Sequence, residues 1–501
     1  MALDKDTSYA QEVDVAGSQF EMEKADPEGA LATNVVSAID HAAEKKLLRK
    51  LDIRIMPLIM GLYLFSFLDR VNIGNARVYG MEQSLGLTGS QFQLSVSIFF
   101  VTYVLFEIPS NMIIKKITPS KWLAFITFSW GIISTLTGMT QNLGGLIACR
   151  ILMGIFEAGL FPGLSLYLTT FYTRQELGLR YSWLFTCNGL AGALGGLIAY
   201  AIGHMEDVGG LEAWRWIFIL EGLPTIILGA ITWFALADFP QTAHYLSQEE
   251  RDLLMARRGR QAGFSASWDE MHKSDVMKGV KDWKVYVMAF GQFCGASMLY
   301  GYSTFLPTII LDLGTWNRVV TNAMTIPCYA LGVITYIIIG WISDRLQLRG
   351  CFPAACGIIS VIGYGVLLAP VSAAAHYAGC LLVGMGLYVF VGMPLAWLPM
   401  NCPKYGKRAF ASAFQLTISN LSGVIVPFLY TSNFGPRYIQ GNGAVLGWVG
   451  TGTIIYGSMF MYYVRKNAGR VAGKEDHKIE GKTEEQIADM GDESPRFIYV
   501  T

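Results

Sequence analysis

Long apolar runs separated by short polar segments dominate this chain of 501 residues. A helix needs about 20 apolar residues to cross a bilayer, and closed backbone hydrogen bonding makes helices the structure that such runs predict. The runs lie near 53–75, 91–114, 120–140, 143–171, 180–203 and 214–236, and then near 284–311, 319–343, 352–371, 375–399, 408–432 and 445–465. The sequence therefore predicts an all-α membrane protein with twelve transmembrane helices in two six-helix bundles.

Composition and the polar gaps support this organisation. Charged residues make up 15% of the chain and hydrophobic residues 52%, whereas soluble domains carry about 25% charged residues. The polar N-terminal segment has no cleavable signal peptide, so insertion is expected to begin with the first span. The predicted parts are a cytoplasmic N-terminal tail (1–50), an N-terminal bundle (51–236), a central cytoplasmic loop (237–283), a C-terminal bundle (284–465) and a cytoplasmic C-terminal tail (466–501).

Lysine and arginine gather in the loops on one side of the predicted bundle. They include Lys115, Lys116, Lys121, Arg174, Arg180, Arg345, Arg349, Lys404, Lys407 and Arg408. The opposite loops, 203–213 and 370–376, contain neither residue type. Because basic loops stay on the cytoplasmic side, both termini and the central loop are predicted to be cytoplasmic, in the plasma membrane. Within that loop, Ser247 and Glu250 form a capping-box pattern that predicts the start of a short helix.

A gating motif follows the eighth run. Gly340, Asp344 and Arg345 match the Gly-x-x-x-Asp-Arg pattern that the major facilitator superfamily places between the second and third helices of each half. The glycine would permit close helix approach, and the charged pair would form a cytoplasmic gate. The equivalent first-half loop, EIPSNMIIKKITPSK, keeps the basic charge but lacks the glycine and aspartate.

Charged side chains inside the predicted spans are the strongest indication of function. An ionised group at mid-membrane costs about 2.5–3.5 kcal/mol even on the lenient insertion scale. The first half nevertheless contains Asp69, Arg70, Glu107, Arg150 and Glu157. They are expected to face a water-filled cavity or to pair with one another. Glu107, which lies close before Pro109, is interpreted as structural.

Arg150, Gly154 and Glu157 share one face of the fourth span, at spacings of four and three. With Gly159 also small, this face is interpreted as a site where an anionic substrate approaches the helix. Arg150 would bind the substrate, or else form a structural salt bridge. Glu157 is the candidate proton carrier, because a buried carboxylate has raised proton affinity; a purely structural role is the alternative.

Arg70 is the best candidate for binding a substrate carboxylate, because a guanidinium offers a planar, two-pronged donor. The adjacent Asp69 is expected to neutralise Arg70 when the site is empty and to take part in proton coupling. Neighbours on a helix point about 100° apart, so one of the two can serve packing instead. A helix-end ion pair near the outer membrane surface is the structural alternative.

The second half is poor in charge inside its spans. Its candidates for substrate binding are Tyr300 and Asn420, which accompany Gln292 and Gln415. Such groups either hydrogen-bond a substrate or join helices together. The sequence leaves both interpretations open.

Several segments resemble a known family. LDRVNIGNAR, RILMGIFEAGLFPG, EAWRWIFILEG, LSQEER, KRAFASAFQLTISNLSG and GPRYIQGN together resemble the fungal allantoate-permease branch of the anion:cation symporter family, within the major facilitator superfamily. The resemblance implies the major facilitator fold and proton-driven import of a small organic anion, such as a carboxylate vitamin or a ureido acid. It also implies anion binding at Arg70 and proton coupling at Asp69 and Glu157, and it matches Arg150 to the family's fourth-helix arginine.

Two alternatives to import remain. One is an exporter of an acidic fungal metabolite or toxin, and the other is a nutrient sensor that binds substrate without transporting it. No nucleophile-base or metal-ligand constellation appears, so an enzyme is not expected, and neither is a cofactor, a metal or a nucleic-acid partner. The protein is expected to act as a monomer in the lipid bilayer.

Overall fold

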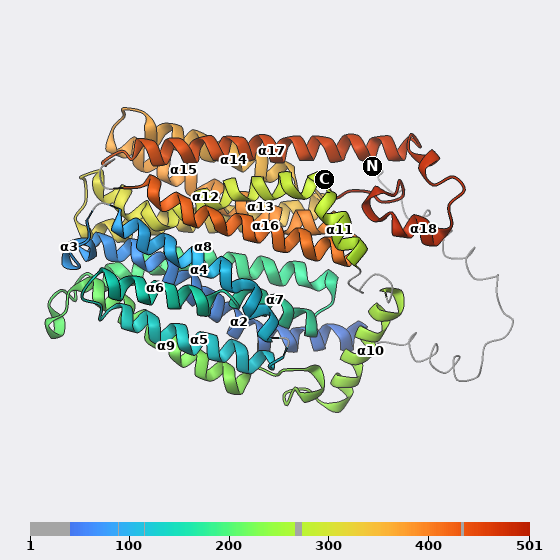
Figure 1. The fold of residues 1–501 in the computed structure, drawn as a ribbon, viewed down its shortest axis with the longest axis horizontal. Helices are drawn as coiled ribbons and strands as arrows, with labels where there is room; N and C mark the ends of the chain where they lie inside the picture. Colours follow the sequence, from blue (N-terminus) through green and yellow to red (C-terminus); the bar gives the residue numbers. More distant parts are fainter. Residues whose placement is uncertain (1–40, 89, 115, 266–272, 432–434) are drawn as a thin grey trace, which may run out of the picture.

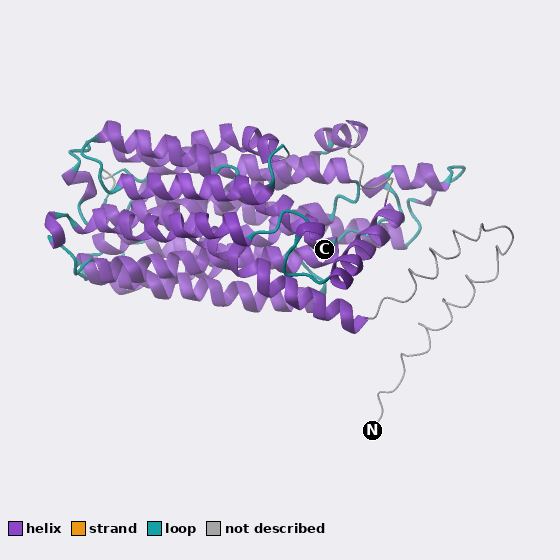
Figure 2. Ribbon diagram, turned by 90° about the horizontal axis from the view of Figure 1, so that it is seen from below, coloured by secondary structure: helices purple, strands orange, loops and turns teal. Residues whose placement is uncertain are grey.

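The computed structural model describes residues 41–88, 90–114, 116–265, 273–431 and 435–501. Within these ranges the ordered elements are helices, with no β-strand (Figure 2). The first 40 residues of the predicted N-terminal tail lie outside the described ranges. Twelve long helical segments run side by side, which confirms the predicted fold class.

The first six segments follow the first six apolar runs closely. They are α2 (His41–Val78), α4 (Gln91–Ile114), α5 (Pro119–Thr137), α6 (Leu143–Glu157) with α7 (Leu160–Phe171), α8 (Arg174–Ile202) and α9 (Ala213–Ala235). The fourth segment is broken between α6 and α7, at Ala158 and Gly159. The break follows Glu157 directly and precedes Pro162. Proline has no backbone N–H, so Pro162 cannot donate the helical hydrogen bond to the carbonyl four residues earlier.

The second six segments follow the second group of runs. They are α12 (Trp283–Asp312), α13 (Arg318–Leu346), α14 (Cys351–Leu368), α15 (Ala373–Met400), α16 (Tyr405–Ile425) and α17 (Ile439–Val471). Ten of the twelve described segments are long and apolar enough to cross a bilayer, with α6 and α7 taken together. The other two are α5 and α12. They complete the bundles by packing against α9 and α16.

The two halves meet mainly along three helix pairs. Helix α13 packs on α8, α12 on α2, and α16 on α4, and Figure 1 shows the blue-to-green helices beside the yellow-to-red ones. Close approach of α2 and α12 depends on Gly74, where an added Cβ would lie 2.2 Å from the carbonyl oxygen of Thr304. Small residues at such crossings let two membrane helices touch.

The central loop forms two helices, α10 (Gln248–Ser265) and α11 (Lys273–Lys281). The predicted capping box is present: the Ser247 N–H donates to Glu250 Oε2 at 2.9 Å, and the Glu250 N–H donates to Ser247 Oγ at 3.3 Å. Glu250 also accepts from Lys50 Nζ at 2.6 Å, which attaches α10 to α2. In contrast, α11 packs on α16, so the two loop helices contact opposite halves.

Helix α2 begins at His41, before the predicted boundary of the bundle at residue 51. Packing explains the extension, because Leu47 and Leu51 are fully buried. A contact between Glu44 Oε1 and Arg257 Nε at 2.5 Å holds the same turn against α10. The helix therefore continues out of the membrane along the loop.

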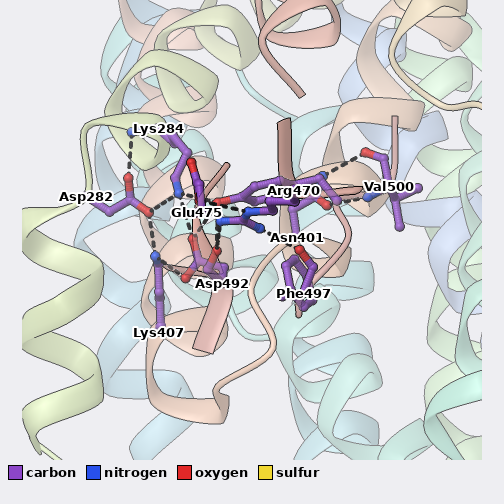
Figure 3. A network of polar contacts seen from close by, with 10 residues as sticks. Asp282, Lys284, Asn401, Lys407, Arg470, Glu475, Asp492, Phe497 and Val500 are labelled. Atoms are coloured by element: carbon purple, nitrogen blue, oxygen red, sulfur yellow. Dashed lines mark hydrogen bonds and ion pairs between the residues drawn. The ribbon is translucent and has the colours of Figure 1, made fainter. Parts of the chain in front are cut away.

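The C-terminal residues also pack onto the bundle. Helix α17 continues past the predicted end of the last span, and the chain then forms α18 (Glu484–Asp489) before returning to the helix ends. Asp492 accepts from Lys284 Nζ at 2.6 Å and from Lys407 Nζ at 2.7 Å (Figure 3). The Val500 carbonyl accepts from Trp397 Nε1 at 2.7 Å. The last residues thus join the ends of α12, α15 and α16.

All of these extramembrane helices gather at one end of the bundle. Figure 1 shows α10, α11, α18 and the C-terminus at the same end, opposite the short helix α3 (Met81–Ser84). This arrangement requires an even number of crossings between the start of α2 and the end of α17, in agreement with the twelve segments.

Candidate functional site

A cavity lies between the two bundles. Its walls come from α2, α4, α7 and α8 of the first half and from α12, α15 and α16 of the second half. The polar residues that line it are Tyr63, Ser66, Arg70, Tyr103, Glu107, Asn188, Gln292, Tyr300, Ser419 and Asn420. Its volume is about 60 Å³, room for a few water molecules. In this conformation the side chains therefore leave little free space.

Arg70 lines this cavity and forms an ion pair with Glu157, which is not among the lining residues. Arg70 Nε donates to Glu157 Oε1 at 2.6 Å, and Ser66 Oγ donates to the same oxygen at 2.5 Å. The Glu157 side chain is fully buried, and its second oxygen, Oε2, has no partner among the described residues. One carboxylate oxygen is therefore fully engaged, and the other is free to take a proton.

Aromatic rings surround the Arg70 guanidinium. Its Cζ lies 5.0 Å from the ring centroid of Phe67, 5.5 Å from that of Phe99 and 4.8 Å from that of Tyr103. Cation–π contacts of this kind stabilise a desolvated arginine. The rings keep the guanidinium at the cavity, while its Nε donates to Glu157.

Asp69 points away from Arg70. Its carboxylate accepts from Trp130 Nε1 at 2.9 Å and from Ser134 Oγ at 2.6 Å, both on α5. The expectation that Asp69 neutralises Arg70 in the empty site is therefore wrong for this conformation, and so is the alternative of an Asp69–Arg70 ion pair at a helix end. The physical reason is the rotation of about 100° between neighbours on a helix, which turns Asp69 to α5 and Arg70 to the cavity.

Arg150 is not brought to the cavity. Its side chain is 2% exposed, it contacts the sulfur of Met153, and its Nε and Nη2 have no hydrogen-bond partner among the described residues. Asp69 acts on it electrostatically. Arg150 therefore lies behind α2, in the interior of the first bundle.

The small residues of α6 and of the break that follows it serve helix packing. A Cβ added to Gly154 would lie 2.1 Å from Thr102 Oγ1, and one added to Gly159 would overlap Ser110 Oγ. Both contacts are with α4. The interpretation of this face as an approach route for substrate is therefore wrong, because α4 already fills it.

The second half brings Tyr300 and Asn420 together on the opposite wall. Tyr300 Oη donates to Asn420 Oδ1 at 2.8 Å, and the Tyr300 ring lies 4.4 Å from the ring of Phe100. Gln292 also lines the cavity, but its amide donates to the Val391 carbonyl at 3.0 Å and joins two helices. Each of these hydrogen bonds joins two helices, and Tyr300, Asn420 and Gln292 all line the cavity.

The predicted gating residues lie at the end of α13. Asp344 pairs with Arg349 at 2.5 Å, and Arg345 Cζ lies 3.9 Å from the ring centroid of Trp341. A Cβ built on Gly340 meets nothing within 4 Å in the described part of the chain. In this conformation the motif makes contacts within its own loop and helix, and the glycine supports no close crossing.

Three further polar groups lie at the cavity or in the core, beyond the residues that the sequence singled out for substrate and proton binding. Glu107, interpreted as structural, lines the cavity, as does Asn188, which was not considered. Glu221 on α9 is buried and accepts from Asn72 Nδ2 at 2.7 Å. Glu221 lies within the sixth apolar run, so the membrane cost that singled out the other charges also applied to it.

Comparisons with known proteins agree with this architecture. Residues 59–427 match the family model of the Major Facilitator Superfamily. An uncharacterized transporter of Schizosaccharomyces pombe is 42% identical over 92% of both chains. The high-affinity nicotinic acid transporter of Saccharomyces cerevisiae is 31% identical, over 92% of this chain and 85% of its own length.

A solved structure shares the fold at low sequence identity. It is a bacterial homologue of the human lysosomal transporter Spinster, in an inward-facing and occupied conformation. The TM-score is 0.63 at 14% identity, over 82% of this chain and 96% of that one. The family match, the relatives and the twelve-helix architecture lead to one conclusion. The chain is a multi-pass membrane protein that belongs to the major facilitator superfamily of transporters.

Proposed function

We propose that this transporter couples the entry of a proton to the uptake of a small organic anion. The observation that carries the proposal is the Arg70–Glu157 ion pair, in which Arg70 lines the cavity between the two halves and Glu157 keeps one carboxylate oxygen without a partner among the described residues. The pair unites an anion-binding group and a proton-binding group in one contact. A proton on one partner therefore changes what the other can bind.

The coupling follows from electrostatics in a buried site. Unprotonated Glu157 occupies Arg70 and neutralises it. A proton on Glu157 Oε2 removes that negative charge and leaves a buried guanidinium, which is unfavourable without a counter-ion. A substrate carboxylate then provides the counter-ion, bound by the two-pronged guanidinium. Proton and anion thus favour each other's binding, as a symporter requires.

The opposite wall would set selectivity. Tyr300 and Asn420 offer a hydroxyl and an amide, and the surrounding rings offer apolar faces. This combination suits a flat or small carboxylate with one further polar group, such as a carboxylate vitamin or a ureido acid. The nicotinic acid transporter among the relatives takes a substrate of that kind.

Transport would proceed by alternating access, with the N-terminal bundle (51–236) rocking against the C-terminal bundle (284–465) around the cavity. Asp69 and Arg150, close behind Arg70 and Glu157, would respond to the charge changes at that pair. Gly340, Asp344 and Arg345 would close the cytoplasmic side. We further propose a monomer in the plasma membrane, with both termini and the central loop (237–283) cytoplasmic.

Uptake of labelled carboxylates tests the proposal. Cells that lack their own carboxylate carriers would express the wild type or Arg70→Ala, and accumulation of nicotinate, pantothenate and allantoate would be measured with and without a protonophore. We expect accumulation of at least one anion, lost with the protonophore and lost in Arg70→Ala at equal surface expression.

Other outcomes would decide against parts of the proposal. Accumulation that survives the protonophore contradicts proton coupling. Accumulation of an anion in Arg70→Ala as in the wild type contradicts the role of Arg70. Faster loss of preloaded anion from expressing cells than from control cells would favour export instead, and anion binding without any flux would favour a sensor.

A further inference from the structure

A second buried carboxyl group lies outside the cavity. Glu221 of α9 is 2% exposed and Asn72 of α2 is 0% exposed, and neither lines the cavity. Asn72 Nδ2 donates to Glu221 Oε2 at 2.7 Å. The pair therefore joins α2 to α9 in the interior of the N-terminal bundle, in a place that the coupling step at Glu157 does not use.

If Glu221 were ionised, the hydrogen bonding of the Glu221–Asn72 pair would be incomplete. Glu221 Oε1 and Asn72 Oδ1 both lack a hydrogen-bond partner among the described residues. Buried polar atoms rarely stay unpaired, because each costs about 1–3 kcal/mol. In the described part of the chain no lysine, arginine or histidine contacts Glu221. A buried negative charge with a single amide donor is unfavourable.

We propose that Glu221 is held as a neutral carboxylic acid, paired with Asn72 through two hydrogen bonds. Asn72 Nδ2 donates to Oε2, and a proton on Glu221 Oε1 donates to Asn72 Oδ1. One proton thus gives partners to both orphaned oxygens. Glu221 is a resident proton site and a positioning residue, distinct from the exchanging site at Glu157.

The charges in the surrounding core agree with a neutral Glu221. Arg70 is paired with Glu157, and Asp69 acts electrostatically on Arg150. These four groups already cancel. Asp69 lies three residues before Asn72 on α2, so the charge on the same helix face is negative. An ionised Glu221 would add an uncompensated negative charge to that core.

The consequence for transport lies in the orientation of α2. Asn72 is three residues after Asp69 and two after Arg70. Anchoring Asn72 to α9 fixes the rotation of this turn, so that Asp69 faces α5 and Arg70 faces the cavity. Loss of the anchor would let the turn rotate and would misplace both groups.

Infrared spectroscopy of the purified full-length protein in lipid tests the proposal without a substrate. The variants are Glu221→Gln, which keeps an amide in place of the acid, and Glu221→Leu, which keeps the size but leaves Asn72 unpaired. Glu484→Gln, at an exposed residue of α18, is the control. The measurements are the protonated-carboxyl band from about pH 5.5 to about pH 8, where ordinary carboxylates are ionised, and the thermal unfolding midpoint.

We expect a protonated-carboxyl band in the wild type that Glu221→Gln removes and Glu484→Gln retains. This component should keep its amplitude across the pH range. The unfolding midpoint of Glu221→Gln should stay near that of the wild type, while Glu221→Leu should fall by several degrees. A band that is unchanged in Glu221→Gln, or whose Glu221 component disappears as the pH rises, overturns the proposal. Neither result depends on whether the protein carries an anion.

Discussion

The Arg70 guanidinium and the Glu157 carboxylate meet at 2.6 Å, although 87 residues separate them in the chain. The contact joins α2 to the end of α6, where the fourth segment breaks. Ser66 donates to the same Glu157 oxygen, so both α2 residues that meet Glu157 are one helical turn apart. This arrangement makes the two groups interdependent, and the first two predictions test it.

Arg70→Ala should reduce uptake by about 100-fold, because two charge-assisted hydrogen bonds to the substrate are worth about 3 kcal/mol. Arg70→Lys keeps the charge but loses the planar fork, and should reduce uptake by about tenfold. Initial uptake rates at equal surface expression provide the measurement, with Lys121→Ala as an exposed control. Equal rates in the lysine variant and the wild type would show that only the charge matters.

Glu157→Gln should abolish proton-driven accumulation and preserve counterflow exchange of labelled for unlabelled anion. Glutamine keeps the volume and can still accept from Ser66, but it cannot carry the proton. The two assays are run on the same proteoliposomes, with and without an inwardly directed pH gradient. An equal loss in both assays would assign Glu157 to substrate binding or packing instead.

Tyr300→Phe should raise the KM for the transported anion about fivefold, since one neutral hydrogen bond contributes about 1 kcal/mol, and should leave proton coupling intact. Tyr302→Phe is the matched control: its hydroxyl donates to the Cys380 carbonyl at 2.7 Å, away from the cavity. That variant should lower thermal stability without changing KM. Similar KM values in the two variants would remove Tyr300 from the binding site.

Asp492→Asn should destabilise the C-terminal bundle by about 1–3 kcal/mol, because it removes one of the two carboxylates, Asp492 and Asp282, that the buried Lys284 and Lys407 share. Glu484→Gln breaks an exposed ion pair with Arg496 and should change stability by less than about 1 kcal/mol. Thermal unfolding of the purified variants measures the difference. Equal midpoints would mean that the C-terminal residues do not support the bundle.

Acid should weaken the attachment of the C-terminal segment through Glu475. Burial alone would raise the pKa of Glu475, but Lys466, Lys478 and Arg470 outweigh it and lower the pKa to about 2. Because the pKa of Glu475 is lower in the folded state, its ionised carboxylate stabilises the fold at pH values above the pKa of the unfolded state, about 4.3. This contribution is lost as the pH falls towards 2. Between these two pH values, the thermal unfolding midpoint of the wild type should therefore fall more steeply than that of Glu475→Gln. Parallel curves would contradict the assignment.

The contribution of Asp492 to stability is also lost on acidification. Burial opposes ionisation, yet Lys284 and Lys407 hold the pKa of Asp492 below its usual range. Its contribution is present above the unfolded pKa of aspartate, about 3.9, and is lost on acidification through the folded pKa. In Asp492→Asn, this part of the acid dependence should disappear.

Hydropathy alone was enough to predict the twelve segments and the two bundles, because a bilayer imposes its thickness on every span. The boundaries were less predictable. Helix α2 starts at His41 and α17 ends at Val471, since both continue beyond the apolar runs to pack against the loop and the C-terminal segment. Those extensions depend on contacts with residues far away in sequence, which no local pattern contains.

The candidate site was likewise predictable only in part. The sequence by itself determined that Asp69, Arg70, Arg150 and Glu157 need a special environment, because membrane cost is a property of the residue type and its depth. Only the tertiary structure decided that Arg70 pairs with Glu157, that Asp69 turns to α5, that Gly154 packs on α4, and that Glu221 belongs with Asn72. Partners are chosen by which helix faces meet, and that depends on the rotation and packing of whole helices.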